Sequence, residues 1–362
     1  MTRLNRTKCT AGAVAVALTG LVSGCGAPDL SAMRPTVQKQ AAAVMVVGKP
    51  DFMPTTPVSA SGDEPLMMET VQSSTGSFLN QANTLLQHQD VTNCVIAVDD
   101  AGALDSDISQ LAQKYAHVHF DILTNQAPSD ISASNVAIVS QDANAVDFAI
   151  GWLVGVWASN LVKTQQLSLQ PAVGYAVSGV SASRQKAFFA GLYTANPAAQ
   201  IVNMTGSNNS ASNNTSNSSA GNSTTTTSTA PTQYPVVSGV VVGGNLAQPV
   251  AESIAQNAPI VFDLTGASTT LPNLSVYPGH LAPSRATDLI DQISGGHWQA
   301  GSTSVIDSTS VTLNTQLMPP PVVDAWQTLA QTLEQAPNTW QTDYAKLPDA
   351  TRNLLQSQFG LA

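Results

Sequence analysis

The chain has 362 residues, and its 23 acidic residues outnumber its 13 lysine and arginine residues, which gives a formal net charge of −10. A chain so poor in basic residues lacks the positive surface that contact with a phosphate backbone requires, so we expect no nucleic-acid partner. Its length is enough for two domains of ordinary size.

The N-terminus has the pattern of a secretion signal. Three basic residues precede an apolar run at 11–22 that is too short to form a stable membrane span, and the run leads into Leu-Val-Ser-Gly-Cys. Segment 1–24 therefore resembles the signal peptide of a bacterial lipoprotein. The resemblance implies that Cys25 is lipidated, that residues 25–40 form a tether, and that the protein lies on the extracytoplasmic face of the cell membrane. The alternative is an ordinary signal peptide that happens to contain a cysteine.

Short runs rich in valine and isoleucine follow along the chain, and they are apolar on both faces, as buried parallel strands are. The predicted strands are 43–47, 94–98, 119–123, 135–139, 172–177, 238–243 and 259–264, with a short return strand near 311–314. Helical periodicity predicts helices between them at 108–115, 146–161, 183–195, 248–256 and 285–294. Alternation of this kind predicts an α/β fold with parallel sheets flanked by helices.

Two segments stand outside these layers. Residues 203–233 consist mostly of serine, threonine and asparagine and carry no charge. They cannot bury enough apolar surface to offset the entropy of ordering, so we expect a disordered insertion. The tail at 318–362 opens with three prolines and predicts helices near 322–333 and 349–358.

The sequence contains no recognisable catalytic, cofactor or metal motif. The stretch 171–204 reads as a strand, a small-residue turn and a helix, but it lacks the G-x-S-x-G elbow, the phosphate loop and the dinucleotide fingerprint. What remains is the rim of a ligand cleft, although any strand-to-helix connection looks the same. The five histidines are scattered, and Cys94 lies in an apolar strand where a buried inert thiol is expected. We therefore expect no enzyme, no cofactor and no metal.

Taken in order, several segments resemble one family. "NVAIVSQDANAVDFAIGWLVGVWASN" is followed by "AVGYAVSGVSASRQKAFFAGLYTANPAAQIVNM", then by "VVSGVVVGGNLAQPVAESIAQNAPIVFDLTG" and "LIDQISGGHWQAGSTSVIDSTSVTLN". Their order and spacing are similar to those of the basic-membrane-protein family of substrate-binding lipoproteins. The resemblance is best from 116 to 314, about half of the chain.

The resemblance implies a two-lobed type I periplasmic-binding fold whose lobes are joined by three crossovers, with the ligand between them. Lobe one would comprise 41–142 with 277–308, and lobe two 143–276 with 309–317. The implied partners are a nucleoside-like solute, the permease subunits of an ABC importer, and the membrane through the lipid anchor.

The resemblance also implies ligand-binding residues. Asp263 ends a strand where the family places an aspartate near the ribose hydroxyls, and the alternative is that it caps the next turn. "GSFLNQANTLL" echoes the family's S-F-N-Q signature, which implies ligand contacts for Ser77 and Asn80 and base stacking for Phe78.

The first lobe departs from the family pattern. The D-x-G signature is absent, the stretch from Lys49 to Ser74 reads as a long loop, and a strand and a helix of the family are missing before Cys94. A second hypothesis is therefore a degenerate binding-fold lipoprotein that acts as a sensor, regulator or assembly factor without binding a nucleoside.

Overall fold

The computed structural model describes residues 41–53, 67–87, 91–129, 131–165, 171–204, 237–246, 248–266 and 270–361. The predicted signal segment, Cys25, the tether and nearly all of the insertion at 203–233 lie outside the described residues, so those expectations stay predictions.

The first sheet of the described chain has six strands in the order β11-β5-β4-β3-β1-β2, and all its neighbours are parallel. Its strands are β1 (Ala41–Val47), β2 (Met67–Ser73), β3 (Val91–Asp100), β4 (His119–Gln126), β5 (Val136–Gln141) and β11 (Gly301–Val305). One face packs against α1 (Phe78–Leu86) and α2 (Asp105–Lys114), which follows the short 3-10 helix η2 (Ala101–Leu104). The other face packs against α6 (Ser284–Ser294).

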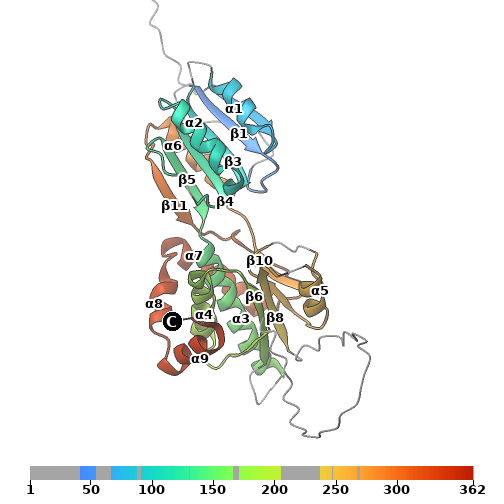
Figure 1. Cartoon of the computed structure of the whole chain (residues 1–362). Helices are drawn as coiled ribbons and strands as arrows, with labels where there is room; N and C mark the ends of the chain where they lie inside the picture. Colours follow the sequence, from blue (N-terminus) through green and yellow to red (C-terminus); the bar gives the residue numbers. More distant parts are fainter. Residues whose placement is uncertain are drawn as a thin grey trace, which may run out of the picture. The chain divides into compact units, whose positions relative to one another are not determined.

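The second sheet also has six described strands, in the order β12-β10-β9-β8-β6-β7, and only β12 is antiparallel to its neighbour. Its strands are β6 (Ala172–Ser178), β7 (Gln200–Asn203), β8 (Gly239–Gly244), β9 (Val261–Asp263), β10 (Leu274–Pro278) and β12 (Val311–Leu313). The helices α3 (Ala143–Gln165) and α4 (Ala182–Ala195) cover one face, and α5 (Gln248–Gln256) covers the other (Figure 1). The C-terminal helices α7 (Pro320–Gln335), α8 (Thr339–Ala345) and α9 (Asp349–Phe359) extend the α3–α4 layer.

The two helices α3 and α4 cross at very short range. A Cβ added to Gly151 would lie 2.0 Å from the carbonyl oxygen of Phe188, and one added to Gly191 would lie 2.0 Å from that of Phe148.

Among the described helices, α3 is long and apolar enough to cross a membrane, but 67% of its most apolar stretch is buried in the fold. Its composition is therefore that of a core helix enclosed by α4, α7 and the sheet.

This architecture confirms the predicted α/β class with parallel sheets flanked by helices. Every predicted strand and helix is present to within a few residues. Cys94 is buried as expected, and burial raises the pKa of its thiol to about 12.

One expectation about the first lobe was wrong. The stretch read as a loop up to Ser74 contains β2, which pairs in parallel with β1, so the first sheet has as many described strands as the second. The strand β2 precedes α1 in the chain. It escaped detection because an edge strand is not buried on both faces and carries no continuous apolar run.

The chain passes between the two sheets three times: from β5 into α3, from β10 into α6, and from β11 into β12. The expected lobe boundary at 276 falls inside β10, which belongs to the second sheet. In both sheets the spatial order of the strands reverses beside the first strand, β1 or β6, and ligands of α/β proteins bind outside the carboxyl ends of the strands.

Candidate functional site

A cleft of about 970 Å³ lies at the carboxyl ends of strands from both sheets. The ends of β3, β4 and β5 line it from the first sheet, and the segments after β9 and β10 line it from the second. The polar lining residues are Asp99, Asn125, Gln126, Ser140, Gln141, Asp142, Asn144, Arg184, Thr265, Ser304 and Asn338. Because parallel strands place their carboxyl ends at one edge, residues distant in sequence meet here.

Arg184 is the cationic residue of the described lining, and its charge is already engaged. Its Nε lies 2.6 Å and its NH2 nitrogen 3.0 Å from the two carboxylate oxygens of Asp147, and that same NH2 nitrogen donates to the carbonyl oxygen of Leu264 at 2.8 Å. Burial raises the pKa of Asp147 to about 6, and the bonded guanidinium opposes the rise. The carboxylate is therefore mostly ionised at neutral pH, and the pair ties α3 to α4 and to the end of β9.

Asp99 and Asp142 supply the negative charge of the cleft. Burial, followed by the nearby charge of Asp51, raises the pKa of Asp99, while Asn125 and His280 oppose the shift. Asp142 accepts a hydrogen bond from the backbone N–H of Ala145 at 3.0 Å, which caps the first turn of α3. Asp99 in turn accepts a hydrogen bond from the side-chain amide of Asn125 at 3.2 Å, so one oxygen of each carboxylate is already hydrogen-bonded within the protein.

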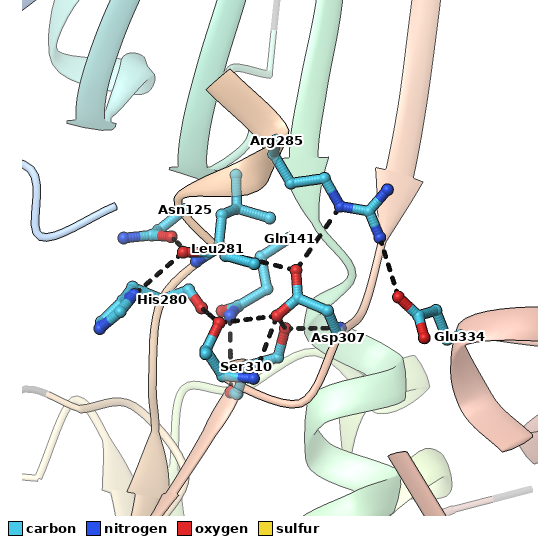
Figure 2. Close-up of polar contacts among 10 residues, drawn as sticks. Asn125, Gln141, His280, Leu281, Arg285, Asp307, Ser310 and Glu334 are labelled. Atoms are coloured by element: carbon cyan, nitrogen blue, oxygen red, sulfur yellow. Dashed lines mark hydrogen bonds and ion pairs between the residues drawn. The ribbon is translucent and has the colours of Figure 1, made fainter. Parts of the chain in front are cut away.

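The crossover segments beside the cleft are held together by a polar network (Figure 2). Asp307 accepts from the backbone N–H of Ala282 at 3.0 Å and from the hydroxyl of Thr309 at 2.7 Å. Asn125, at the end of β4, donates to Asp99 and accepts from the backbone N–H of Leu281 at 2.9 Å. These bonds join the β10–α6 and β11–β12 crossovers to each other and to the cleft wall.

The C-terminal helices also reach this region. Trp326 of α7 donates to the carbonyl oxygen of Ser308 at 3.3 Å, and Glu334 lies 3.5 Å from Arg285 of α6 (Figure 2). Asn338, in the connection between α7 and α8, lines the cleft. The tail therefore contributes to the cleft rim as well as to the layer of helices.

Asp263 lies beside the cleft but does not line it. It is 1% exposed, and its Oδ1 accepts from the backbone N–H of Thr265 at 2.9 Å and from the Thr265 hydroxyl at 3.1 Å. These contacts match the alternative in which it caps the turn after its strand. The residues that follow it, through Gly266, form the cleft wall.

The other sequence-derived candidates lie apart from the cleft lining. Phe78 is fully buried in the core between the first sheet and α1, so it presents no ring face to a ligand. Ser77 shares hydrogen bonds with Ser73 and Ser74, and Asn80 is exposed on α1. They follow the edge strand β2, and the structure does not bring them together with Asp263.

Sequence reasoning missed the residues that do line the cleft. The sequence did contain a signal for them. Asp99 and Asn125 lie in the last two positions of correctly predicted apolar strands, and Asp142 directly follows one. The carboxyl ends of parallel strands share an edge, so these polar residues could have been grouped.

No family model matches the chain, and no curated protein matches its sequence. Solved structures are similar to the chain at low sequence identity, and three of them are described here. A solute-binding protein of an ABC transporter system from Aeropyrum pernix has 11% identity and a TM-score of 0.42, over 87% of this chain and 86% of that one. A transcriptional activator of the comK gene from Bacillus halodurans has 10% identity and a TM-score of 0.46, over 82% and 99%. A carbohydrate transporter solute-binding protein from Agrobacterium radiobacter, in complex with D-arabinose, has 13% identity and a TM-score of 0.38, over 80% and 99%. Similarities of this size do not identify a ligand.

Proposed function

We propose that this protein is a membrane-anchored extracytoplasmic solute-binding lipoprotein of an ABC importer, and that its cleft holds a small, hydroxyl-rich solute. The supporting observation is the lining of the cleft at the carboxyl ends of both sheets, where carboxylates, carboxamides and hydroxyls converge. Carboxylates accept hydrogen bonds from vicinal hydroxyls, and carboxamides both donate and accept them. A polyol can therefore satisfy this lining.

The charges of the cleft favour a neutral solute or a cationic one. The positive charge of Arg184 is compensated by Asp147, and the other charged lining residues that the structure describes are Asp99 and Asp142. An anion such as a phosphate ester would meet two carboxylates without a free cation, which disfavours its binding.

The nucleoside ligand implied by the basic-membrane-protein resemblance is the finer hypothesis. Vicinal ribose hydroxyls suit the cleft as other polyols do. The described lining contains no aromatic ring, so a purine base would lack the stacking partner it usually has. A sugar or a related polyol is therefore favoured over a nucleoside.

A second candidate is a sensor, regulator or assembly lipoprotein that keeps the fold without delivering a solute. The observation in its favour is the C-terminal tail, which lines the cleft through Pro337 and Asn338 and contacts α6 through Glu334. Because the tail contacts the cleft rim, a change in the cleft could alter the position of the tail, which a partner protein could then recognise.

A thermal-shift screen of the purified protein against pentoses, hexoses, polyols, nucleosides and free bases tests the ligand class. A specific ligand at about a hundredfold excess over its dissociation constant stabilises the folded state by roughly 2.7 kcal/mol, which raises the melting temperature by several degrees. We expect sugars or polyols to produce this shift. A shift with nucleosides alone would favour the family's ligand, and a flat response from cooperatively melting protein would contradict solute binding.

Substitution then locates the bound compound. Asp99→Asn removes a carboxylate from the cleft, and we expect it to weaken binding at least about tenfold because a hydrogen bond to a charged group is lost. Asp324→Asn is the matched control, since Asp324 is exposed on α7 and does not line the cleft. Equal weakening in both variants, or in neither, would place the ligand elsewhere.

The lipid anchor is tested separately. In a bacterial host, Cys25→Ser should move the protein from the detergent phase to the aqueous phase of a Triton X-114 extraction, because the acyl chains supply the membrane affinity. Detergent partitioning that is unchanged in this variant would contradict lipidation at Cys25.

A further inference from the structure

A second cavity, of about 250 Å³, lies in the first sheet away from the cleft. It is lined by the early residues of β4, β5 and β11, by the C-terminal half of α6, and by the segment from His297 to Ala300. Figure 1 shows these strands next to α6. The cleft residues Asn125 and Gln126 come from the opposite end of β4, so the two cavities are separate.

The floor of this cavity is a row of residues in register across three strands. Asp121 of β4 pairs with Ala137 of β5, which pairs with Gly301 of β11. A Cβ on Gly301 would meet nothing within 4 Å. Two small residues therefore leave open space on the side of Asp121 that faces β5 and β11.

Asp121 points to the α6 side of the sheet. Leu123, two residues further along β4, and Val95, its neighbour on β3, both belong to the core between the sheet and α6. Side chains two residues apart on a strand share a face, so Asp121 is on this face too. Asp121 is therefore a carboxylate that lies beside the apolar side chains of this core.

The carboxylate lacks the partner that its burial calls for. Asp121 is 2% exposed, its Oδ2 is buried without a hydrogen bond, and no lysine or arginine of the described chain forms an ion pair with it. An isolated buried charge is costly, and a cation with an N–H donor relieves that cost. Burial raises the pKa of Asp121 to about 7, and the N–H of Trp298 opposes the rise without completing a hydrogen bond of normal geometry.

The aromatic side chain of Trp298 lines one side of this cavity. The indole of Trp298 stacks on the ring of His119 with centroids 4.0 Å apart and an interplanar angle of 4°. His119 precedes Asp121 by two residues on the same face of β4, so the stack holds the indole edge beside the carboxylate. The other titratable lining residue is His297, which is exposed.

We propose that this cavity is a binding site for a small alkylammonium ion, in which the ammonium group donates to Asp121 Oδ2 and the alkyl part lies over Ala137 and Gly301 beside Trp298. A hard metal ion does not fit, because the described residues contain no group of three or more acidic, histidine or cysteine ligands and such ions require several oxygen ligands. The volume is below that of pockets for drug-sized molecules, which favours a short ligand. The proposal does not depend on the solute that the cleft binds.

The test uses NMR titration of the purified protein with ethanolamine and with 1,4-diaminobutane, in amine-free phosphate buffer at pH 8, where Asp121 is mostly ionised. The indole N–H resonance that disappears in Trp298→Phe is the local probe. We expect it to shift saturably with both amines and not with 1,4-butanediol, which has the same chain without the charge.

Two variants and one control complete the test. Asp121→Asn removes the charge in nearly the same shape, and Ala137→Val narrows the cavity and keeps the carboxylate; each should weaken amine binding at least about tenfold. Asp288→Asn is the control, because Asp288 is exposed on α6 and does not line the cavity. The absence of a saturable shift at millimolar amine, or undiminished binding in Asp121→Asn, would overturn the proposal. Neither result bears on the cleft, whose ligand screen is independent.

Discussion

At the scale of single residues, two buried aspartates illustrate how partners decide the behaviour of a charge. Asp147 and Asp121 both have pKa values raised by burial, to about 6 and about 7. Asp147 has a bidentate guanidinium partner, so its charge is retained near neutral pH and joins two helices. Asp121 has no such partner in the described chain, which makes it a source of pH-dependent instability.

We predict that Asp121→Asn changes the pH dependence of stability. Between its ordinary pKa of 3.8 and its folded pKa of about 7, the unfolded chain releases the proton while the native state retains it. The burial of Asp121 therefore does not lower the free energy of unfolding at low pH, where the carboxyl is protonated in both states. The free energy of unfolding falls as pH rises from 3.8 towards 7. Relative to the wild type, the variant should gain about 2 to 3 kcal/mol in free energy of unfolding between pH 5 and pH 8.

Urea denaturation in amine-free acetate and phosphate buffers measures this difference at each pH. The control is Asp288→Asn, which removes an exposed carboxylate of α6 and leaves Asp121 in place. A difference for Asp121→Asn that did not change with pH would mean that Asp121 is as solvated in the native state as in the unfolded chain.

At the scale of elements, the contact between α3 and α4 depends on glycines that face backbone atoms. The obstacle to a side chain at Gly191 is the carbonyl oxygen of Phe148, only 2.0 Å from the added Cβ. Backbone cannot rotate aside as a flexible side chain can, so the helices would have to separate. This contact carries the Asp147–Arg184 pair, which borders the cleft.

Gly191→Ala should therefore lower the free energy of unfolding by about 2 kcal/mol, because overpacking outweighs the gain of about 1 kcal/mol in helix propensity. Denaturant unfolding monitored by circular dichroism measures the change. Gly76→Ala is the control, since nothing lies within 4 Å of its added Cβ, and it should be nearly neutral. Equal stability of Gly191→Ala and the wild type would show that the helices adjust without cost.

The same scale explains which elements could be predicted from sequence. The central strands were predictable because burial on both faces requires runs of valine and isoleucine. The edge strands β2 and β11 were not, because solvent-facing positions such as Ser302 to Ser304 carry no apolar signature. Asn125 and Asp142 could be placed at the cleft edge by parallel-strand geometry. The pair of Arg184 and Asp147 joins residues that are 37 positions apart on two helices, and it follows from no local pattern.

At the scale of the whole described molecule, the cleft depends on the three passages of the chain between the sheets. Asp307 bonds one crossover to another, and Asn125 bonds the β10–α6 crossover to the end of β4. Lining residues from both sheets are adjacent to these bonds, so a solute that contacts both sheets should also restrain the crossovers. A bound solute would therefore affect backbone opening in segments that are far apart in sequence.

Hydrogen–deuterium exchange with and without the compound that gives the largest thermal shift tests this account most directly. We predict slower exchange at the carboxyl ends of strands in both sheets, in 124–127 and 140–145 of the first and in 264–266 and 278–281 of the second. Protection confined to one sheet, or located only around β11 and the end of α6, would contradict a solute site at the carboxyl ends of the two sheets.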